Sequence, residues 1–287
     1  VIFEHKGQIR QNAQIKRIIV ENGTAKGVEL EDGTKFMANK AVVSTIDIHQ
    51  TFLKYVGEDK LQKDFVDMVK IWQWEKWSLC DLHLSLEEPP RFKAAESNPE
   101  VNKAFVYVLG YENSTELKHE WDLMEKGELP KTAGYIASFP SVHDPYQAPP
   151  GKASGLLSQM APFSLKDGGS EKWLKYKFRE QIAEYQLATL QKYAPNITRD
   201  KVLWWNITTP ADIQNKFANM VRGSYKQGQY HPLQMGYLRP NQECSHNVTP
   251  IKNLFVGGAG VWPGRAVNMR LGYTCATTIA EECGTQK

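Results

Sequence analysis

Alternating apolar and polar positions predict a β-rich start to this chain. A strand over residues 15–20 is followed by the turn Asn22-Gly23, and a second strand over residues 26–30 is followed by Asp32-Gly33. Asx-Gly dipeptides between β-branched runs are strong hairpin signals, because both turn positions accept left-handed backbone angles. We therefore expect two consecutive hairpins, with a third strand over residues 34–37.

Strand and helix patterns alternate through the centre of the chain. Thr209-Pro210 predicts a helix start, because proline is favoured in the first turn. Residues 221–250 are rich in Gly, Pro, Gln and Tyr and predict a loop region. The predicted helices cover residues 48–55, 60–70, 114–126 and 170–193. The predicted strands cover residues 41–43, 81–86, 104–109, 135–139, 155–161 and 202–207. This alternation predicts an α/β fold.

The stretch over residues 253–283 combines a short apolar run with a glycine-rich break and a helical pattern. Residues 254–256 predict a buried strand, and the turn at Pro263-Gly264 precedes a helix that runs to Cys283. A strand that feeds a glycine turn and a helix start can present backbone N–H groups to an anion. The same pattern also fits an ordinary turn, and the glycines alone favour that plainer interpretation. The glycines of the break are Gly257, Gly258 and Gly260.

Composition narrows the class of protein. With 287 residues, 41% of them hydrophobic and 23% charged, the chain can bury the core of one large or two ordinary domains. A net charge of +3 is too small to indicate nucleic acid. The four cysteines show no CxxC spacing, which argues against zinc and disulfides and favours a reducing, cytoplasmic compartment. No apolar run reaches the ~18 residues typical of a membrane-spanning helix.

Candidate acids and bases do not form a recognisable catalytic motif. No HxxxH or HExxH spacing occurs, and no histidine stands in a nucleophile-type motif, so hydrolase and metal-site interpretations fail on spacing. The candidate histidines are His49, His83, His143, His231 and His246.

Aromatic residues gather in two places. Trp72, Trp74 and Trp77 form one group, and the segment over residues 225–237 is rich in tyrosine. Both groups fit a pocket for a long apolar substrate, an aromatic core, or a belt at a membrane surface. For the tryptophans we place the core first, because tryptophan is highly buried on average.

Four stretches resemble the phytoene desaturase-like flavoproteins, which include carotenoid desaturases, carotenoid isomerases and retinol saturases. Any one of them is weak, but their order and spacing are specific and extend over essentially the whole chain. This group belongs to the amine-oxidase-type FAD superfamily. The stretches are GQIR through VST (residues 7–45), SVHDPYQAPPG (141–151), TPAD (209–212), and GYLRP with TPI and the glycine stretch through Tyr273 (236–273).

The resemblance implies that one part of the cofactor site lies outside this chain. Members of the family begin with a βαβ unit whose GxGxxG loop grips the FAD pyrophosphate. No GxGxxG followed by a helix occurs here, and Gly258-Ala259-Gly260 matches the family's second FAD contact instead. Because the chain also starts at Val1, we expect a fragment of a longer protein, with a partner chain that supplies the unit as the alternative.

The implied architecture is the C-terminal part of a two-domain FAD-dependent oxidoreductase. An incomplete Rossmann-like FAD domain would form from residues 1–47, its second segment, and residues 236–287, its C-terminal segment. An inserted α+β substrate-binding domain would occupy residues 48–235.

The resemblance also implies which residues contact FAD. The backbone of Ile15 would lie at the adenine end, and Gly258–Gly260 would approach the ribityl-phosphate region. Pro263, Gly264 and Val267–Met269 would open a helix whose N–H groups point at the flavin's pyrimidine edge, where reduced flavin carries negative charge. Arg265, Ala266 and Met269 depart from the glycines of many members. The implied set is Ile15, Gly258, Ala259, Gly260, Pro263, Gly264, Val267, Asn268 and Met269.

Polar residues follow the predicted strand over residues 41–43. Ser44, Thr45 and Asp47 stand at the carboxyl end of that strand, where α/β sheets bind ligands. For Thr45 and Asp47 we favour a helix N-cap over a ligand contact.

The function implied is FAD-dependent oxidation–reduction at carbon–carbon bonds of an isoprenoid, carotenoid or retinoid-like substrate, as in carotenoid biosynthesis. The flavin would carry out the hydride chemistry, so a missing catalytic triad does not count against it. The alternatives are a non-catalytic fragment unable to hold FAD and an amine-oxidase-type flavoenzyme. The expected partner is an apolar small molecule, and we expect neither a metal ion nor nucleic acid. The expected location is the cytoplasm, with peripheral membrane association as the alternative.

Overall fold

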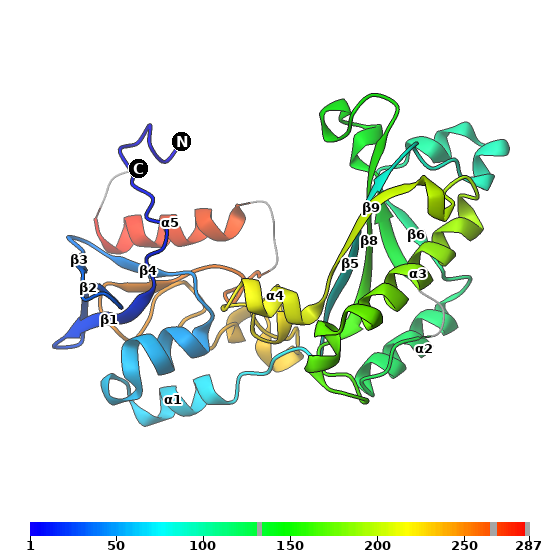
Figure 1. The fold of residues 1–287 in the computed structure, drawn as a ribbon. Coiled ribbons are helices and arrows are strands. Elements are labelled where there is room, and N and C mark those ends of the chain that lie inside the picture. The colour runs from blue at the N-terminus through cyan, green and yellow to red at the C-terminus, as the bar shows by residue number, and fades with distance from the viewer. Residues whose placement is uncertain (131–133, 265–268, 285–287) are drawn as a thin grey trace. The chain divides into compact units, whose positions relative to one another are not determined.

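The computed structural model describes residues 1–130, 134–264 and 269–284 and divides them into two compact units (Figure 1). One unit combines Val1–Trp74 with Tyr225–Lys287, and the other is Glu75–Ser224. The chain thus crosses between units at residues 74–75 and 224–225, whereas the sequence placed the domain boundaries at residues 47–48 and 235–236. Which unit binds cofactor and which binds substrate stays a prediction.

The first unit opens with the predicted antiparallel sheet, in the order β1–β2–β3. These strands are β1 Ile15–Glu21, β2 Thr24–Leu30 and β3 Lys35–Met37. Asn22 and Gly23 both have positive φ, 49° and 70°, as a tight two-residue hairpin turn requires. Both predicted hairpins are confirmed.

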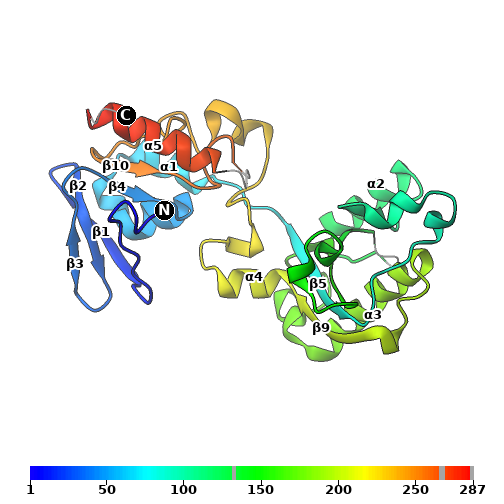
Figure 2. The same cartoon turned by 90° about the horizontal axis from the view of Figure 1, so that it is seen from above.

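A separate parallel pair joins two segments that lie far apart in the sequence. Strand β4 (Val42–Ser44) pairs with β10 (Leu254–Val256), with Val42 opposite Leu254 and Ser44 opposite Val256. All three β10 side chains are buried, as expected for a parallel strand. Helix α5 (Arg270–Glu282) packs beside β10, where the Cys275 thiol contacts the Val256 carbonyl (Figure 2).

Helical segments follow β4 and complete the core of this unit. A π-helix spans Gln50–Gly57, a 3₁₀ turn spans Glu58–Lys60, and α1 spans Lys63–Lys70. Their apolar faces pack with the strands and with Trp72, which is only 5% exposed, so the core position expected for this tryptophan is confirmed. The buried cluster includes Ile18, Ala25, Val42, Ile48, Phe52, Val56, Phe65, Val69, Ile251, Leu254 and Val256.

The second unit is built on a five-stranded antiparallel sheet in the order β6–β7–β8–β5–β9. Alternate side chains of these strands are buried against α2 (Ser114–Glu125) and α3 (Tyr176–Tyr193), which both lie on one face of the sheet (Figure 1). The strands are β5 Trp77–Leu86, β6 Tyr107–Leu109, β7 Tyr135–Ser138, β8 Ala153–Pro162 and β9 Val202–Thr208.

The predicted helix over residues 170–193 is interrupted. A 3₁₀ turn over Ser170–Leu174 precedes α3, because Lys175 has extended backbone angles between them. Helix α4 (Pro210–Lys216) begins as expected, with Thr209 and Asp212 forming a capping box. No helix in the described residues is both long and apolar enough to cross a membrane.

The remaining ordered segments are single 3₁₀ turns in the connections. They cover Lys93–Glu96, Pro99–Lys103, Pro140–Val142, Pro145–Gln147, Arg199–Lys201, Val221–Gly223, Pro232–Gln234 and Gly236–Leu238.

The packed face of the five-stranded sheet should dominate the stability of the second unit. Leu157 is fully buried at its centre, so Leu157→Ala is expected to lower the free energy of unfolding by about 2–5 kcal/mol. Leu203, on the edge strand, is 50% exposed, and Leu203→Ala should change it by less than about 0.5 kcal/mol. Urea unfolding followed by circular dichroism measures both. Equal losses would contradict the packing described here.

Candidate functional site

The parallel pair places two chain segments together at the carboxyl ends of β4 and β10. The Gly257 N–H donates to the Ser44 carbonyl at 2.9 Å, which extends the pairing one residue past β10. From there the chain enters the glycine turn, residues 257–264, beside Thr45. Carboxyl ends of parallel strands are the edge at which α/β sheets bind ligands.

Two glycines give this turn its shape. Gly258 and Gly264 have φ of +81° and +67°, a region that residues with a Cβ rarely adopt. A Cβ on Gly264 would also lie 2.9 Å from the Tyr230 hydroxyl oxygen. Glycine is therefore required here by the protein's own backbone and packing.

The glycine turn leaves two adjacent backbone donors available. The Gly258 carbonyl accepts from the Val261 N–H at 3.2 Å, and the Ala259 carbonyl accepts from Arg239 Nη2 at 2.9 Å. Both carbonyls are thus used inside the protein, whereas the N–H groups of Gly258 and Ala259 find no acceptor in the part of the chain that the structure describes. Both residues are partly exposed, so their N–H groups can receive an anionic or hydroxyl-bearing ligand.

Gln227 fastens the glycine turn to the end of β4. Its side-chain oxygen accepts from the Gly260 N–H at 3.0 Å, and its side-chain nitrogen donates to the Thr45 carbonyl at 3.1 Å. The residue is 5% exposed. One buried amide therefore satisfies a polar group on each of the two segments.

A buried arginine also bonds to the glycine turn. Arg239 is fully buried, and its guanidinium donates to five backbone carbonyls as well as lying 4.8 Å from the Tyr230 ring centroid. Delocalised charge and fixed donor geometry suit arginine to such a position. The accepting carbonyls belong to Lys226, Gly228, Gln229, Gln234 and Ala259.

A second buried cation lies close to Arg239. Lys226 is 4% exposed, and its ammonium lies 4.7 Å from the Tyr230 ring centroid. Lys226 and Arg239 therefore pack against the same aromatic ring.

Asp47 has a structural role beside the π-helix, although the N-cap of that helix is His49 and neither Thr45 nor Asp47. The Asp47 carboxylate accepts from the N–H of Gln50, the first residue of the π-helix, at 3.0 Å. Burial raises the pKa of this carboxyl above its ordinary value. A carboxylate that is already satisfied has little capacity for a ligand.

Apart from Met269, the predicted cofactor residues fall into three groups. Gly258, Ala259, Gly260, Pro263 and Gly264 come together in the glycine turn. Ile15 lies in the separate sheet of β1–β3, where it pairs with Leu30. Val267 and Asn268 lie outside the described residues.

The helix after the turn starts later than expected. Met269 is 88% exposed with φ of 60°, and α5 begins only at Arg270. Gly264, with its positive φ, also does not belong to a helix. The prediction that Pro263, Gly264 and Met269 open the helix was wrong, because Gly264 and Met269 have positive φ and α5 begins only at Arg270.

A shallow hollow lies beside the start of α5. Its volume is about 330 Å³, and it is lined by polar side chains from α5 together with Trp262 and Pro263. It gives the glycine turn a concave neighbour within the same unit. Among the described residues, no group of three His, Cys, Asp or Glu side chains could hold a metal ion.

Gln227, Lys226 and Arg239 were missed by the sequence analysis. Arg239 lay within the GYLRP segment but was not singled out, although an arginine inside a matched segment is a usable signal. Nothing local marks Gln227, because its two partners are distant in sequence.

The fold defines the class of protein. The chain resembles an oxidoreductase from Methanosarcina mazei with a TM-score of 0.56 and 18% identity, over 98% of this chain and 51% of that one. It resembles a putrescine oxidase with a TM-score of 0.51 and 11% identity, over 98% of this chain and 51% of the putrescine oxidase chain. At such identities these likenesses show the fold alone, an α/β architecture that matches about half of each of the two longer chains.

Curated relatives narrow the class to a family. The chain is 33% identical to a limonene dehydrogenase component of Castellaniella defragrans, over 96% of this chain and 52% of the relative. It is 24% identical to prolycopene isomerase of Daucus carota, over 100% of this chain and 42% of the relative. It is also 24% identical to a phytoene desaturase of Cereibacter sphaeroides, over 93% of this chain and 48% of the relative. No family model matches the chain.

These relatives confirm the resemblance that the sequence motifs indicated. The chain is a relative of a limonene dehydrogenase component, a prolycopene isomerase and a phytoene desaturase. It spans about half the length of the curated relatives that it matches.

Removing the Gln227 amide should destabilise the first unit. Gln227→Ala leaves the Gly260 N–H and the Thr45 carbonyl without their side-chain partner, so the free energy of unfolding should fall by about 3 kcal/mol. Gln229→Ala is the matched control, because the Gln229 side chain makes no hydrogen bond within the described residues, and about 0.5 kcal/mol or less is expected. Urea denaturation of both variants provides the measurement, and a loss below about 1 kcal/mol at Gln227 would refute its role.

Proposed function

We propose that this chain supplies the flavin-side part of an FAD site in an oxidoreductase that acts on carbon–carbon bonds of an apolar isoprenoid. Three relatives carry an isoprenoid hydrocarbon in their names: limonene, prolycopene and phytoene. The first of them shares a third of its aligned residues with this chain. Family relation thus supports both the cofactor and the substrate class.

The available donors of Gly258 and Ala259 are the observation that carries the cofactor assignment. They lie at the carboxyl ends of β4 and β10, and both adjoining carbonyls are held inward. The two N–H groups need acceptors, and a cofactor with phosphate and hydroxyl oxygens can provide them. The residues present therefore fit FAD.

FAD, when bound, would supply the hydride acceptance that the reaction needs. The chain's own contribution is to bind the cofactor. The N–H groups of Gly258 and Ala259 would donate to its oxygen atoms. Gln227 holds the turn in register with β4 so that these donors keep their direction.

The open face of the five-stranded sheet is our proposed substrate surface. Val108 and Ile136 face each other across β6 and β7 and are 67% and 53% exposed. Leu156 and Met160 continue this face on β8. An apolar surface on a rigid sheet suits a hydrocarbon substrate.

Two polar pairs interrupt this surface. Ser158 donates to the Asp81 carboxylate across β5 and β8, and His83 lies 3.2 Å from the Thr208 hydroxyl. Burial raises the pKa of Asp81 above its ordinary value. These groups can orient a substrate or hold a proton beside it.

Loss of the Ala259 donor should reduce FAD binding without unfolding the chain. Ala259→Pro removes that N–H, whereas Ala259→Ser retains it, so the proline variant should hold FAD at least about tenfold more weakly. Absorbance near ~450 nm, measured on the protein that includes the upstream coding sequence, reports the bound flavin. Circular dichroism checks that both variants are folded.

The same experiment separates the alternatives. The 287-residue chain without its upstream sequence should be colourless. A colourless product with that sequence present would sink the FAD assignment and leave the non-catalytic fragment. Turnover of putrescine, with none of limonene, prolycopene or phytoene, would establish the amine-oxidase alternative instead.

A charge on the proposed substrate surface should weaken substrate binding. Ile136→Lys is expected to raise KM about tenfold, because it removes apolar contact area from the complex, while the flavin absorbance stays the same. Leu203→Lys, on the edge strand of the same sheet, is the matched control and should leave KM unchanged. Steady-state kinetics with the preferred hydrocarbon of the panel provides the measurement. An unchanged KM in Ile136→Lys would remove this face from the substrate site.

A further inference from the structure

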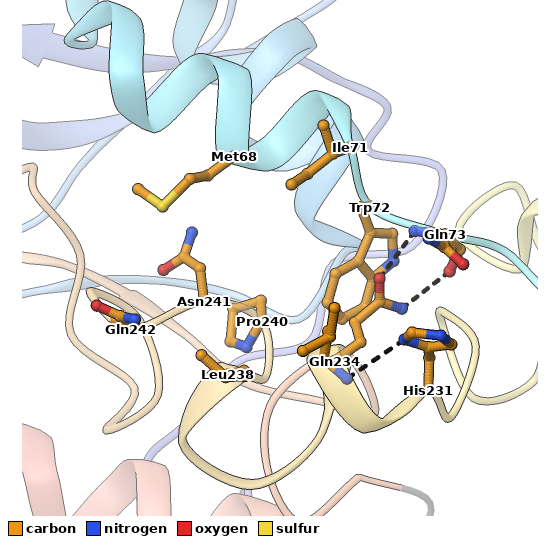
Figure 3. A pocket seen from close by; sticks show the side chains of 11 residues that line it. Met68, Ile71, Trp72, Gln73, His231, Gln234, Leu238, Pro240, Asn241 and Gln242 are labelled. Atoms are coloured by element: carbon orange, nitrogen blue, oxygen red, sulfur yellow. Dashed lines mark hydrogen bonds between the residues drawn. The ribbon is translucent and has the colours of Figure 1, made fainter.

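A second candidate site lies within the first unit, in a cavity between α1 and the loop over residues 231–242 (Figure 3). Its volume is about 220 Å³. Most of its surface is apolar, and the described residues that line it include no Lys, Arg, Asp or Glu. The apolar lining comes from Met68, Ile71, Trp72, Leu233, Leu238 and Pro240.

One buried polar group in this lining has no partner. Asn241 is only 7% exposed, and its side-chain oxygen accepts from the Cys244 N–H at 3.0 Å. That bond fixes the orientation of the amide, since a backbone N–H can donate only to the oxygen. The side-chain nitrogen, by contrast, has no acceptor among the described residues. Figure 3 shows the amide directed toward Met68, whose flexible side chain lines the cavity.

The walls of the cavity are held in place by hydrogen bonds. The Gln234 amide pairs with the backbone of Gln73, accepting from its N–H at 2.8 Å and donating to its carbonyl at 2.9 Å. The Trp72 indole N–H donates to the Gln227 carbonyl at 3.2 Å, and Arg239 lies 5.1 Å from the indole ring centroid. A cavity with fixed walls loses little entropy when a ligand enters.

We propose that this cavity binds a compact, neutral, apolar molecule with one carbonyl oxygen, and that Asn241 donates to that oxygen. An unsatisfied buried donor is costly, so an acceptor at this point adds binding free energy that a pure hydrocarbon cannot provide. The apolar lining accepts the carbon skeleton. The volume lies below the ~300 Å³ of the smallest drug-sized pockets, which indicates a single-ring compound.

This site is distinct from the proposed FAD contact. Its lining residues include none of the glycine turn, so its occupation does not depend on the cofactor assignment. Loss of FAD binding in Ala259→Pro would leave it intact.

Acetophenone and isopropylbenzene form a matched pair of probes, because they share a ring and a branched substituent but only the first carries a carbonyl. Ligand-observed NMR titration of the purified protein measures both affinities. Asn241→Leu should weaken acetophenone about tenfold and leave isopropylbenzene within about twofold, since only the ketone uses the donor. Asn241→Asp keeps the bond from Cys244, removes the donor, and should show the same selective loss.

A blocked cavity provides an independent check. Met68→Trp places a larger side chain on the partly exposed face of α1 that lines the cavity, and it should abolish binding of both probes. Met220→Trp, in a loop of the other unit, is the control and should change neither affinity. Absence of acetophenone binding, or equal binding by the parent protein and both Asn241 variants, would overturn the proposal.

Discussion

The parallel pairing of β4 with β10 is the constraint on which the rest of this molecule depends. Parallel neighbours cannot be joined by a hairpin, so the chain between them must leave the sheet and return from the other end. In this protein that connection contains the whole Glu75–Ser224 unit. The pairing thereby explains why one compact unit is assembled from both ends of the chain, and why two carboxyl ends meet at the glycine turn.

Buried polar side chains keep the returning segment in place. Arg239 donates to four carbonyls of a loop that has little regular structure and to a fifth carbonyl, that of Ala259. Gln227 bonds the same loop to Thr45 and Gly260. Arg239 bonds to both Ala259 in the glycine turn and Gln234 in the cavity wall, so a single cation supports both candidate sites. Satisfied networks of this kind specify one arrangement of a loop that packing alone would leave undetermined.

Local sequence signals determined the elements and the family. The Asn22-Gly23 and Asp32-Gly33 turns fixed the first hairpins because only certain residues accept the turn angles. Thr209 and Asp212 fixed the start of α4 because both capping partners lie within one helical turn. Where the outcome depended on a neighbour, the sequence failed: the predicted helix over residues 170–193 breaks before α3, and α5 begins only after the left-handed Met269.

The arrangement of the candidate site was decided by the tertiary structure. The sequence could name Gly258 and Ala259 through a family motif, but it could not show that their carbonyls turn inward and their N–H groups do not. For Ala259 that distinction depends on Arg239, which stands 20 residues earlier in the chain. No sequence motif marks Asn241. It became a candidate only because the Cys244 N–H fixes its amide and residues of α1 line the same cavity. Short-range propensities are encoded in neighbouring residues, whereas the satisfaction of buried polar groups is settled only when distant segments meet.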